Sequence, residues 1–116
     1  MKLNHSITEI KLHLVLVAKK RIIWLDKWLI HEQVINACHS ADVKIITIGM
    51  ANNHCHLLLE FDPVRPVCKQ VEIIKSVSSF KLGKLDPEWS GWRTGYFLNS
   101  VGSKSISRAK KYIENQ

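Results

Sequence analysis

The pattern of hydrophobic and polar positions changes period several times along this chain, and each change marks the boundary of an expected element. Residues 12–18 and 43–48 are rich in large apolar and β-branched side chains, which predicts two strands. In residues 26–41 and 67–82 the apolar side chains recur at three- or four-residue spacing, which predicts two helices.

The C-terminal part of the chain adds one more strand and one more helix. The strand is expected over residues 96–101, and the helix is expected from an N-cap at Ser103 or Ser105 to Gln116. On each of the three helices an apolar stripe identifies the residues expected to pack against the rest of the protein. The stripes consist of Trp28, Leu29, Val34, Ile35 and Cys38, then Val71, Ile74, Val77 and Phe80, and finally Ile106, Ala109 and Ile113.

Residues 52–61 are expected to form a strand that places two histidines together. Side chains alternate between the faces of a strand, so His54 and His56 project from one side while Cys55 and Leu57 enter apolar packing. The short turn before this strand predicts an antiparallel hairpin with residues 43–48. Two imidazoles on one face can hold a divalent ion between them, although two ligands do not complete a site. The same His-x-His pattern is common in proteins that bind no metal.

The order of the expected elements is strand, helix, strand, strand, helix, strand, helix. The first six have the split β-α-β pattern of a ferredoxin-like domain, so we predict an α+β fold that forms one domain over residues 1–116. In that topology the first and third strands are neighbours at the centre of an antiparallel sheet, and both crossover helices cover one face. We expect His54 and His56 to point into the other face, where the terminal helix is free to lie.

Composition favours a polyanionic partner. The chain has 116 residues with 17 Lys and Arg against 10 Asp and Glu, which gives a formal net charge of +7 and a sequence pI of about 9.5. Such a basic domain suits nucleic acid first and an anionic membrane second, although charge alone equally fits a basic protein with no such partner.

Other sequence features bear on location. No window approaches the ~18 to 20 consecutive apolar residues of a membrane span, and the N-terminus has no signal-peptide pattern. The three cysteines are odd in number and contain no Cys-x-x-Cys pair, which argues against a disulfide framework or a structural zinc site. We therefore expect a cytoplasmic location.

Several polar side chains are candidates for contacts with nucleic acid. The basic and hydroxyl residues could hold phosphates, but an ordinary solvated surface explains them equally well. The tryptophans could stack on unpaired bases. The candidate DNA-binding residues are Lys19, Lys20, Arg21, Lys75, Ser79, Lys81, Lys110 and Lys111.

Two isolated features complete the candidate chemistry. His13 is a lone histidine in an apolar strand, and most such residues are hydrogen-bonded structural side chains. Tyr112 and Gln116 are four residues apart and share a face of the terminal helix. A tyrosine close to a metal-bound phosphate could act as a nucleophile, and the glutamine oxygen could supply the missing metal ligand.

Five segments, taken in order, resemble one known family. They are the histidine, apolar and basic run of 11–21, the His-Cys-His strand of 53–59, the helix segment 74–79, the closing strand 92–102 and the tyrosine helix 111–116. The chain is similar over nearly its whole length to the single-tyrosine HUH transposases of IS200-like insertion sequences, which include the REP-associated tyrosine transposases.

This resemblance implies a DNA transposase that cleaves and rejoins single-stranded DNA. It implies that His54, His56 and Gln116 bind one Mg²⁺ or Mn²⁺ ion, and that Tyr112 attacks a phosphodiester to form a 5′-phosphotyrosine link. No nucleotide cofactor is needed. Members of the family are dimers that recognise hairpins at the ends of the element, and in several the tyrosine helix of one subunit serves the metal site of the other.

Departures from the family leave alternatives open. Asn53 stands where the family often has Asp, and members often continue beyond the position of Gln116, so a short terminal helix is expected here. The main alternative is a catalytically inactive relic that still binds hairpins or single-stranded nucleic acid. An RRM-like module is disfavoured because its pattern of glycine and aromatics is missing. An HUH nuclease of replication or plasmid transfer is usually larger.

Overall fold

The computed structural model describes residues 10–19, 24–51, 53–100, 111 and 113–114. The elements are β1 (Ile10–Val17), α1 (Trp24–Ser40), β2 (Lys44–Ala51), β3 (His54–Phe61), α2 (Val67–Leu85) and β4 (Phe97–Ser100). This order confirms the predicted α+β, β-α-β-β-α-β fold. Lys111, Ile113 and Glu114 have helical backbone. Tyr112 lies outside the described residues, so a terminal helix that carries it stays a prediction.

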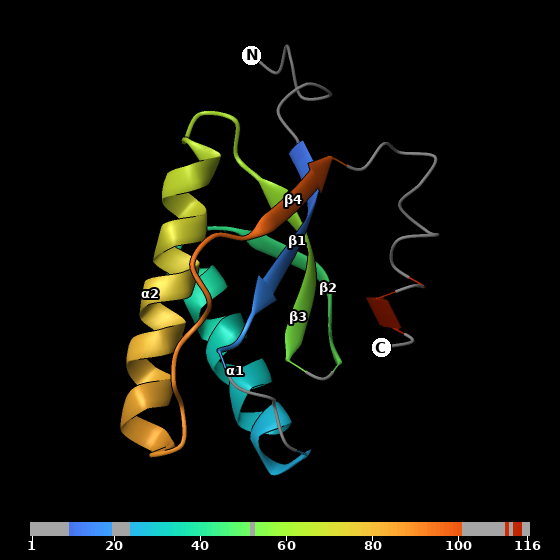
Figure 1. Ribbon diagram of the computed structural model, residues 1–116. Coiled ribbons are helices and arrows are strands. Elements are labelled where there is room, and N and C mark those ends of the chain that lie inside the picture. The colour runs from blue at the N-terminus through green and yellow to red at the C-terminus, as the bar shows by residue number, and fades with distance from the viewer. Residues whose placement is uncertain (1–9, 20–23, 52, 101–110, 112, 115–116) are drawn as a thin grey trace.

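The four strands form one antiparallel sheet in the order β2-β3-β1-β4. The two central strands are β1 and β3, as predicted, and they pair along their full length from Ile10 opposite Phe61 to Val17 opposite His54. Figure 1 shows α1 and α2 together on one side of this sheet, and the short described segment around Ile113 on the other. No helix in the described part of the chain is both long and apolar enough to cross a membrane.

The two sides of the sheet differ in what covers them. We call the side under α1 and α2 the helix face; there Cys55, Leu57 and Leu59 are fully buried in one cluster with residues of both helices. The opposite side carries His13, His54 and His56, and we call it the histidine face. Because alternate residues of a strand point to opposite faces, β3 supplies both surfaces from one run of sequence.

Two aromatic residues assigned to the packed stripes are exposed instead. Trp28 on α1 is 74% exposed and stacks on His31, with ring centroids 5.8 Å apart. Phe80 on α2 is 64% exposed and lies under the Lys84 ammonium, 4.6 Å from the ring centroid. Trp28 is six residues from the buried Val34, and Phe80 is six residues from the buried Ile74. Six residues correspond to about 120° around a helix of 3.6 residues per turn, so both rings point away from these buried positions. The buried positions that the two stripes omitted are Ile30, Gln33, Ala37, Gln70, Ser78 and Leu82.

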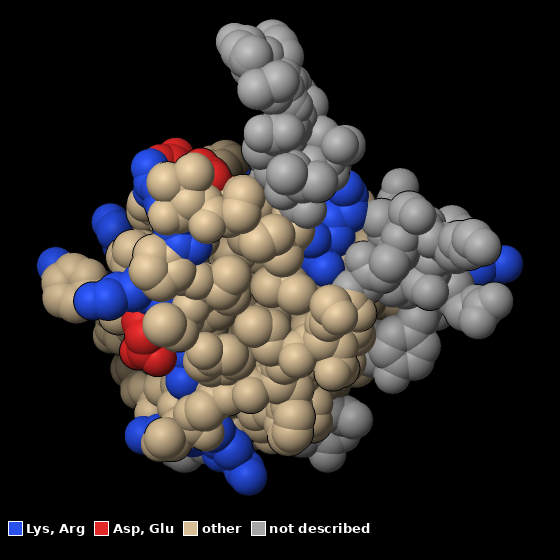
Figure 2. All heavy atoms as spheres, turned by 90° about the horizontal axis from the view of Figure 1, so that it is seen from above, with Lys and Arg blue, Asp and Glu red and all other residues tan. Residues whose placement is uncertain are grey.

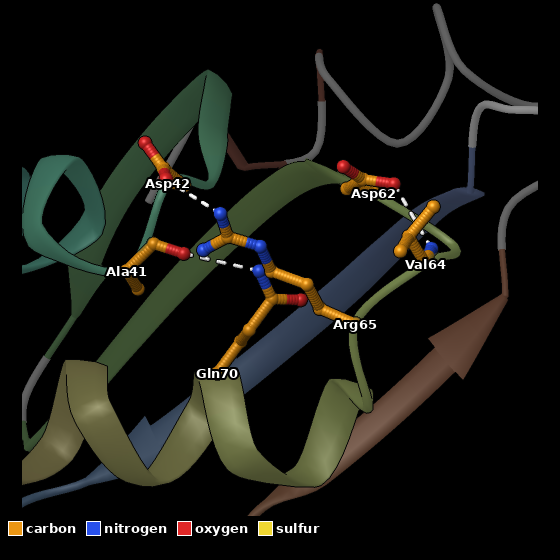
Figure 3. Close-up of polar contacts among 6 residues, drawn as sticks. All are labelled: Ala41, Asp42, Asp62, Val64, Arg65 and Gln70. Carbon is orange, nitrogen blue, oxygen red and sulfur yellow. Dashed lines mark hydrogen bonds and ion pairs between the residues drawn. The ribbon is translucent and has the colours of Figure 1, made fainter.

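Polar contacts tie the end of α1 to the start of α2 (Figure 3). The Gln70 amide donates to the Ala41 carbonyl at 3.0 Å, and the Arg65 guanidinium lies 3.0 Å from the Asp42 carboxylate. Asp42 has φ of 59°, a left-handed conformation in which the chain leaves α1 and turns toward β2. These contacts fix the two helices against each other over the sheet.

A bulge in β2 reverses which of its residues face the histidines. Ile45 pairs with Leu59, but the next pair is Thr47 with Leu58, so one residue of β2 is extra. Ile45 therefore lies on the helix face, while Thr47 and Gly49 lie on the histidine face. Alternation along the sequence could not show this change.

Candidate active site

His54 and His56 project from the same face of β3, as the sequence predicted. Their rings lie nearly parallel, with centroids 6.0 Å apart and planes inclined by 20°. His56 is buried, with 8% of its surface exposed, whereas His54 is only half-buried at the end of the strand. Asn53, just before the pair, donates from its side-chain amide to the Ala18 carbonyl at 3.2 Å. That bond holds the start of β3 against the end of β1.

A third histidine joins this pair from β1. His13 Nε2 lies 3.2 Å from His56 Nδ1, and the two ring centroids are 5.4 Å apart. His13 thus has the hydrogen-bonded role expected for a lone histidine in an apolar strand. The sequence did not identify His56 as its partner, because the strand register that brings the two together is not visible in the sequence. A polar residue within an apolar run was the only signal.

Two imidazoles of the histidine face, those of His13 and His56, have lowered pKa values. Burial lowers the pKa of His56, and the neighbouring His13 and His54 lower it further because a second positive charge would be repelled. Burial also lowers the pKa of His13. Neutral imidazole is the form that coordinates metals, so this environment favours ligation over protonation.

The segment around Ile113 packs against β2 beside the histidines. Ile113 is fully buried, and its backbone carbonyl occupies the space that a Cβ atom on Gly49 would need. Gly49 pairs directly with His56 across the β2–β3 ladder. The Glu114 carboxylate accepts a hydrogen bond from the Thr47 hydroxyl, also on β2, at 3.5 Å. The absence of a side chain at Gly49 therefore lets the C-terminal segment approach the row that contains His56.

Two of the predicted DNA contacts bind the protein's own loop. The Lys75 ammonium donates to the carbonyl oxygens of Arg93 and Gly95 at 3.1 and 3.0 Å. The Ser79 hydroxyl accepts a hydrogen bond from the Trp89 indole at 3.0 Å. Both contacts fasten the α2–β4 loop to α2. The DNA roles of Lys75 and Ser79 stay predictions, and the structure gives both side chains a structural role.

Buried contacts reinforce the same loop. The Trp92 indole donates to the buried Ser78 hydroxyl at 3.0 Å, and the Trp89 and Trp92 rings meet edge to face with centroids 5.0 Å apart. Trp92 is only 6% exposed, so it packs inside the protein and is not available to stack on bases.

The other candidate DNA-binding residues are less constrained. Lys19, Lys81 and Lys111 are exposed. In the view of Figure 2, lysine and arginine side chains are spread around the surface and acidic ones are few. The predicted residues that lie outside the described part of the chain are Lys20, Arg21, Lys110, Tyr112 and Gln116.

The paired imidazoles fit part of a metal site. Imidazole nitrogen suits zinc, copper, iron and nickel, whereas magnesium and manganese prefer oxygen donors such as carboxylate, carbonyl and water. Among the described residues no three His, Cys, Asp or Glu side chains gather as a complete site would require. The predicted third ligand, Gln116, lies outside those residues. The described chain thus offers two imidazole nitrogen donors on one face and leaves the remaining positions to other donors.

An α+β domain whose central strand presents two histidines on the face opposite its helices is the arrangement expected for the HUH class. Residues 6–116 match the family model for IS200-like transposases. The chain therefore belongs to the IS200-like transposase family, as the sequence motifs indicated.

Individual relatives agree with this assignment. The chain is 27% identical over 81 residues to the ISDra2 transposase TnpA of Deinococcus radiodurans. That alignment covers 64% of this chain but only 58% of the relative.

Solved structures share the fold. A crystal structure of a candidate transposase from Deinococcus radiodurans R1 has a TM-score of 0.75 at 18% identity, covering 100% of this chain and 97% of that one. A REP-associated tyrosine transposase bound to a REP hairpin has a TM-score of 0.68 at 11% identity, covering 90% and 64%.

Proposed function

We propose that this protein cleaves and rejoins single-stranded DNA at hairpin-bearing ends of an insertion sequence, through a 5′-phosphotyrosine intermediate on Tyr112. The observation that carries the proposal is the row of residues across β2 and β3. His56 and its neighbour His54 face the same side as Gly49, and Gly49 is packed against Ile113, the residue that follows Tyr112 in the sequence. The geometry thus supports a nucleophile close to the histidine pair.

In the proposed reaction the phenolic oxygen of Tyr112 attacks a DNA phosphorus atom. The bond from phosphorus to the 3′ oxygen breaks, the phenol loses its proton, and the departing 3′ oxygen gains one. A free 3′-hydroxyl can later attack the phosphotyrosine and rejoin two strands, so no nucleotide cofactor is consumed. An unperturbed phenol has a pKa of about 10 and needs activation at neutral pH.

We propose that His54, His56 and Gln116 hold one Mn²⁺ or Mg²⁺ ion next to the attacked phosphate. The ion would polarise the phosphoryl oxygen and offset its developing charge. His13 holds His56 in place through its ring nitrogen, as metal-bound histidines commonly require. By analogy with the hairpin-bound relative we also propose hairpin recognition, and we expect a homodimer.

A covalent-adduct assay tests the nucleophile and the site together. The protein is incubated with labelled single-stranded DNA that carries the end hairpins, with or without Mn²⁺ or Mg²⁺, and resolved on a denaturing gel. We expect a metal-dependent adduct that is lost in Tyr112→Phe and in His54→Ala.

Tyr96→Phe is the matched control, because Tyr96 is the only other tyrosine in the sequence. It should leave adduct formation intact. Tight hairpin binding without any adduct would instead indicate an inactive relic. An adduct that survived Tyr112→Phe would refute the nucleophile assignment while leaving the fold unaffected.

A further inference from the structure

A pocket with a volume of about 690 Å³ opens at the end of β1 beside His54. Small-molecule sites usually span ~300 to 1,000 Å³, so the space suits a group of nucleotide size. Its walls come from the ends of β1 and β3 and from the segment that leads into β4. The lining residues used below are Val17, Asn53, His54, Arg93 and Phe97.

Phe97 gives the pocket an exposed aromatic ring on the histidine face. Its side chain is 65% exposed. Phe97 pairs with Val15 on β1, and Val15 pairs with His56 on β3, so the three side chains lie in one row across the sheet. Since adjacent strands are about 4.8 Å apart, Phe97 and His56 are rooted about 10 Å apart. A base on the ring would therefore belong to a nucleotide close to the histidine pair.

The charge of the pocket suits a phosphate. Arg93 contributes a guanidinium, and none of the described residues that line the pocket is acidic. Guanidinium groups bind phosphate oxygens through paired hydrogen bonds.

The wall that carries Arg93 and Phe97 is held in place from both sides. The Arg93 amide donates to the Val17 carbonyl at 2.6 Å, and Lys75 binds the carbonyls of Arg93 and Gly95 from α2. Gly95 has φ of 84°, a left-handed conformation that glycine adopts without strain. A wall fixed in this way is preorganised for a ligand.

We propose that this pocket binds one unpaired nucleotide adjacent to the phosphate that is cleaved, with its base stacked on Phe97 and its phosphate held by Arg93. The inference rests on the proposed function for the identity of the strand. It adds a site that binds single-stranded DNA separately from any hairpin contact. Stacking on one aromatic ring tolerates every base, so the pocket would position the strand more than select its sequence.

Titration of the isotope-labelled full chain with the tetranucleotide d(T)₄, followed by NMR, tests the site without knowledge of the cleavage sequence. We expect the amide signals of Thr94, Gly95 and Phe97 to shift. Phe97→Ala should raise the Kd about 5- to 150-fold, and Phe97→Trp should retain the affinity because it keeps a ring.

Phe80→Ala is the matched control. It removes the same side chain at the same exposure, 64% against 65%, from α2, outside the residues that line the pocket. Its Kd should equal that of the wild type. Equal losses in both variants, or shifts confined to other surfaces, would overturn the proposal. A change of oligomeric state in Phe97→Ala would show instead that a second copy of the chain covers the ring.

Arg93→Ala provides an independent measurement. Loss of one phosphate contact should reduce the slope of log Kd against log salt by about 0.7 for a single strand. An unchanged slope would remove Arg93 from the site. The adduct assay tests the proposed function separately. If no adduct forms but d(T)₄ still binds in the pocket, the nucleotide site is confirmed and its role in cleavage is refuted.

Discussion

The two faces of the sheet show how one strand can serve stability and chemistry at once. On the helix face, burial raises the pKa of the Cys38 thiol to about 12 and that of Cys55 still higher, so both stay protonated and inert. On the histidine face, burial lowers the pKa of His56, so its nitrogen stays free of a proton and able to coordinate. Desolvation disfavours the charged form in each case, and the residue type decides whether the result is an inert or a binding group.

The largest expected effect is a difference in stability between substitutions of two adjacent leucines on opposite faces of the sheet. Leu57 and Leu58 are both fully buried, but only Leu57 belongs to the core cluster under the helices. Leu57→Ala should lower the free energy of unfolding by about 2–5 kcal/mol, because it leaves a cavity in closely packed surroundings. Leu58 pairs with His13 and Thr47, so truncation at Leu58 would leave a cavity bordered by polar side chains that a water molecule can fill. Leu58→Ala should therefore cost about 2 kcal/mol or less. Chemical denaturation measures the free energy of unfolding of both variants. Equal losses would contradict the proposed difference between the two faces.

A second adjacent pair separates catalysis from stability. His56→Ala should reduce metal-dependent adduct formation at least about 100-fold, because it removes a proposed ligand. Cys55→Ala, on the opposite face, should leave the adduct rate nearly unchanged and lower the free energy of unfolding by about 1 kcal/mol. Gel-based rates and denaturation curves measure the two effects. If Cys55→Ala loses adduct formation without a loss of stability, the assignment of chemistry to the histidine face alone is wrong.

Two lysines of α2 extend the comparison to the loop that forms the pocket wall. Lys75→Ala removes two hydrogen bonds to loop carbonyls and should cost about 1 kcal/mol in unfolding free energy. Lys81 is exposed, so Lys81→Ala should leave stability unchanged. If Lys81 holds a phosphate as predicted, its loss should lower the salt dependence of hairpin binding. Thermal unfolding and binding titrations distinguish the roles, and an unaltered melting temperature for Lys75→Ala would contradict the structural one.

The smallest expected effect is on the dependence of stability on pH. His13 and His56 have pKa values lowered from 6.5 in the folded protein, so near that pH the unfolded chain binds more protons. The free energy of unfolding should therefore rise with pH through the window below about 6.5 and level off above it. His56→Asn should flatten this rise, whereas the thiols of the helix face stay protonated throughout and contribute nothing. If His56→Asn shows the same change of unfolding free energy with pH as the wild type, other groups control the pH dependence.

The sequence predicted the fold well because hydrophobic period and element order are local properties. The boundaries of β1, α1 and α2 fell within a few residues of the observed ones, and the central position of β1 and β3 followed from topology. The errors came from reading the helical stripes too broadly. Trp28 and Phe80 are apolar, yet they lie about 120° around their helices from the buried Val34 and Ile74, respectively.

The site was harder to predict, because its contacts join distant parts of the chain. The His-Cys-His pattern predicted that His54 and His56 share one face of a strand, but pairing His13 with His56 required the β1–β3 register. The contact between Lys75 and the Arg93 carbonyl depends on the path of the α2–β4 loop past α2. The spacing of hydrophobic residues does not specify that path. The bulge in β2 similarly decides that Gly49 faces the histidines.

The contact between Gly49 and Ile113 also bears on how this protein can diverge. The glycine meets the backbone carbonyl of Ile113, and every residue type has a backbone carbonyl. The Ile113 side chain contributes as well, because its Cγ2 methyl would lie 3.1 Å from a Cβ atom on Gly49 and the residue is fully buried. Position 49 is therefore confined to the one residue without a Cβ atom as long as Ile113 occupies this place. A substitution at either position would have to be matched by a change at the other, so the two positions form one steric unit.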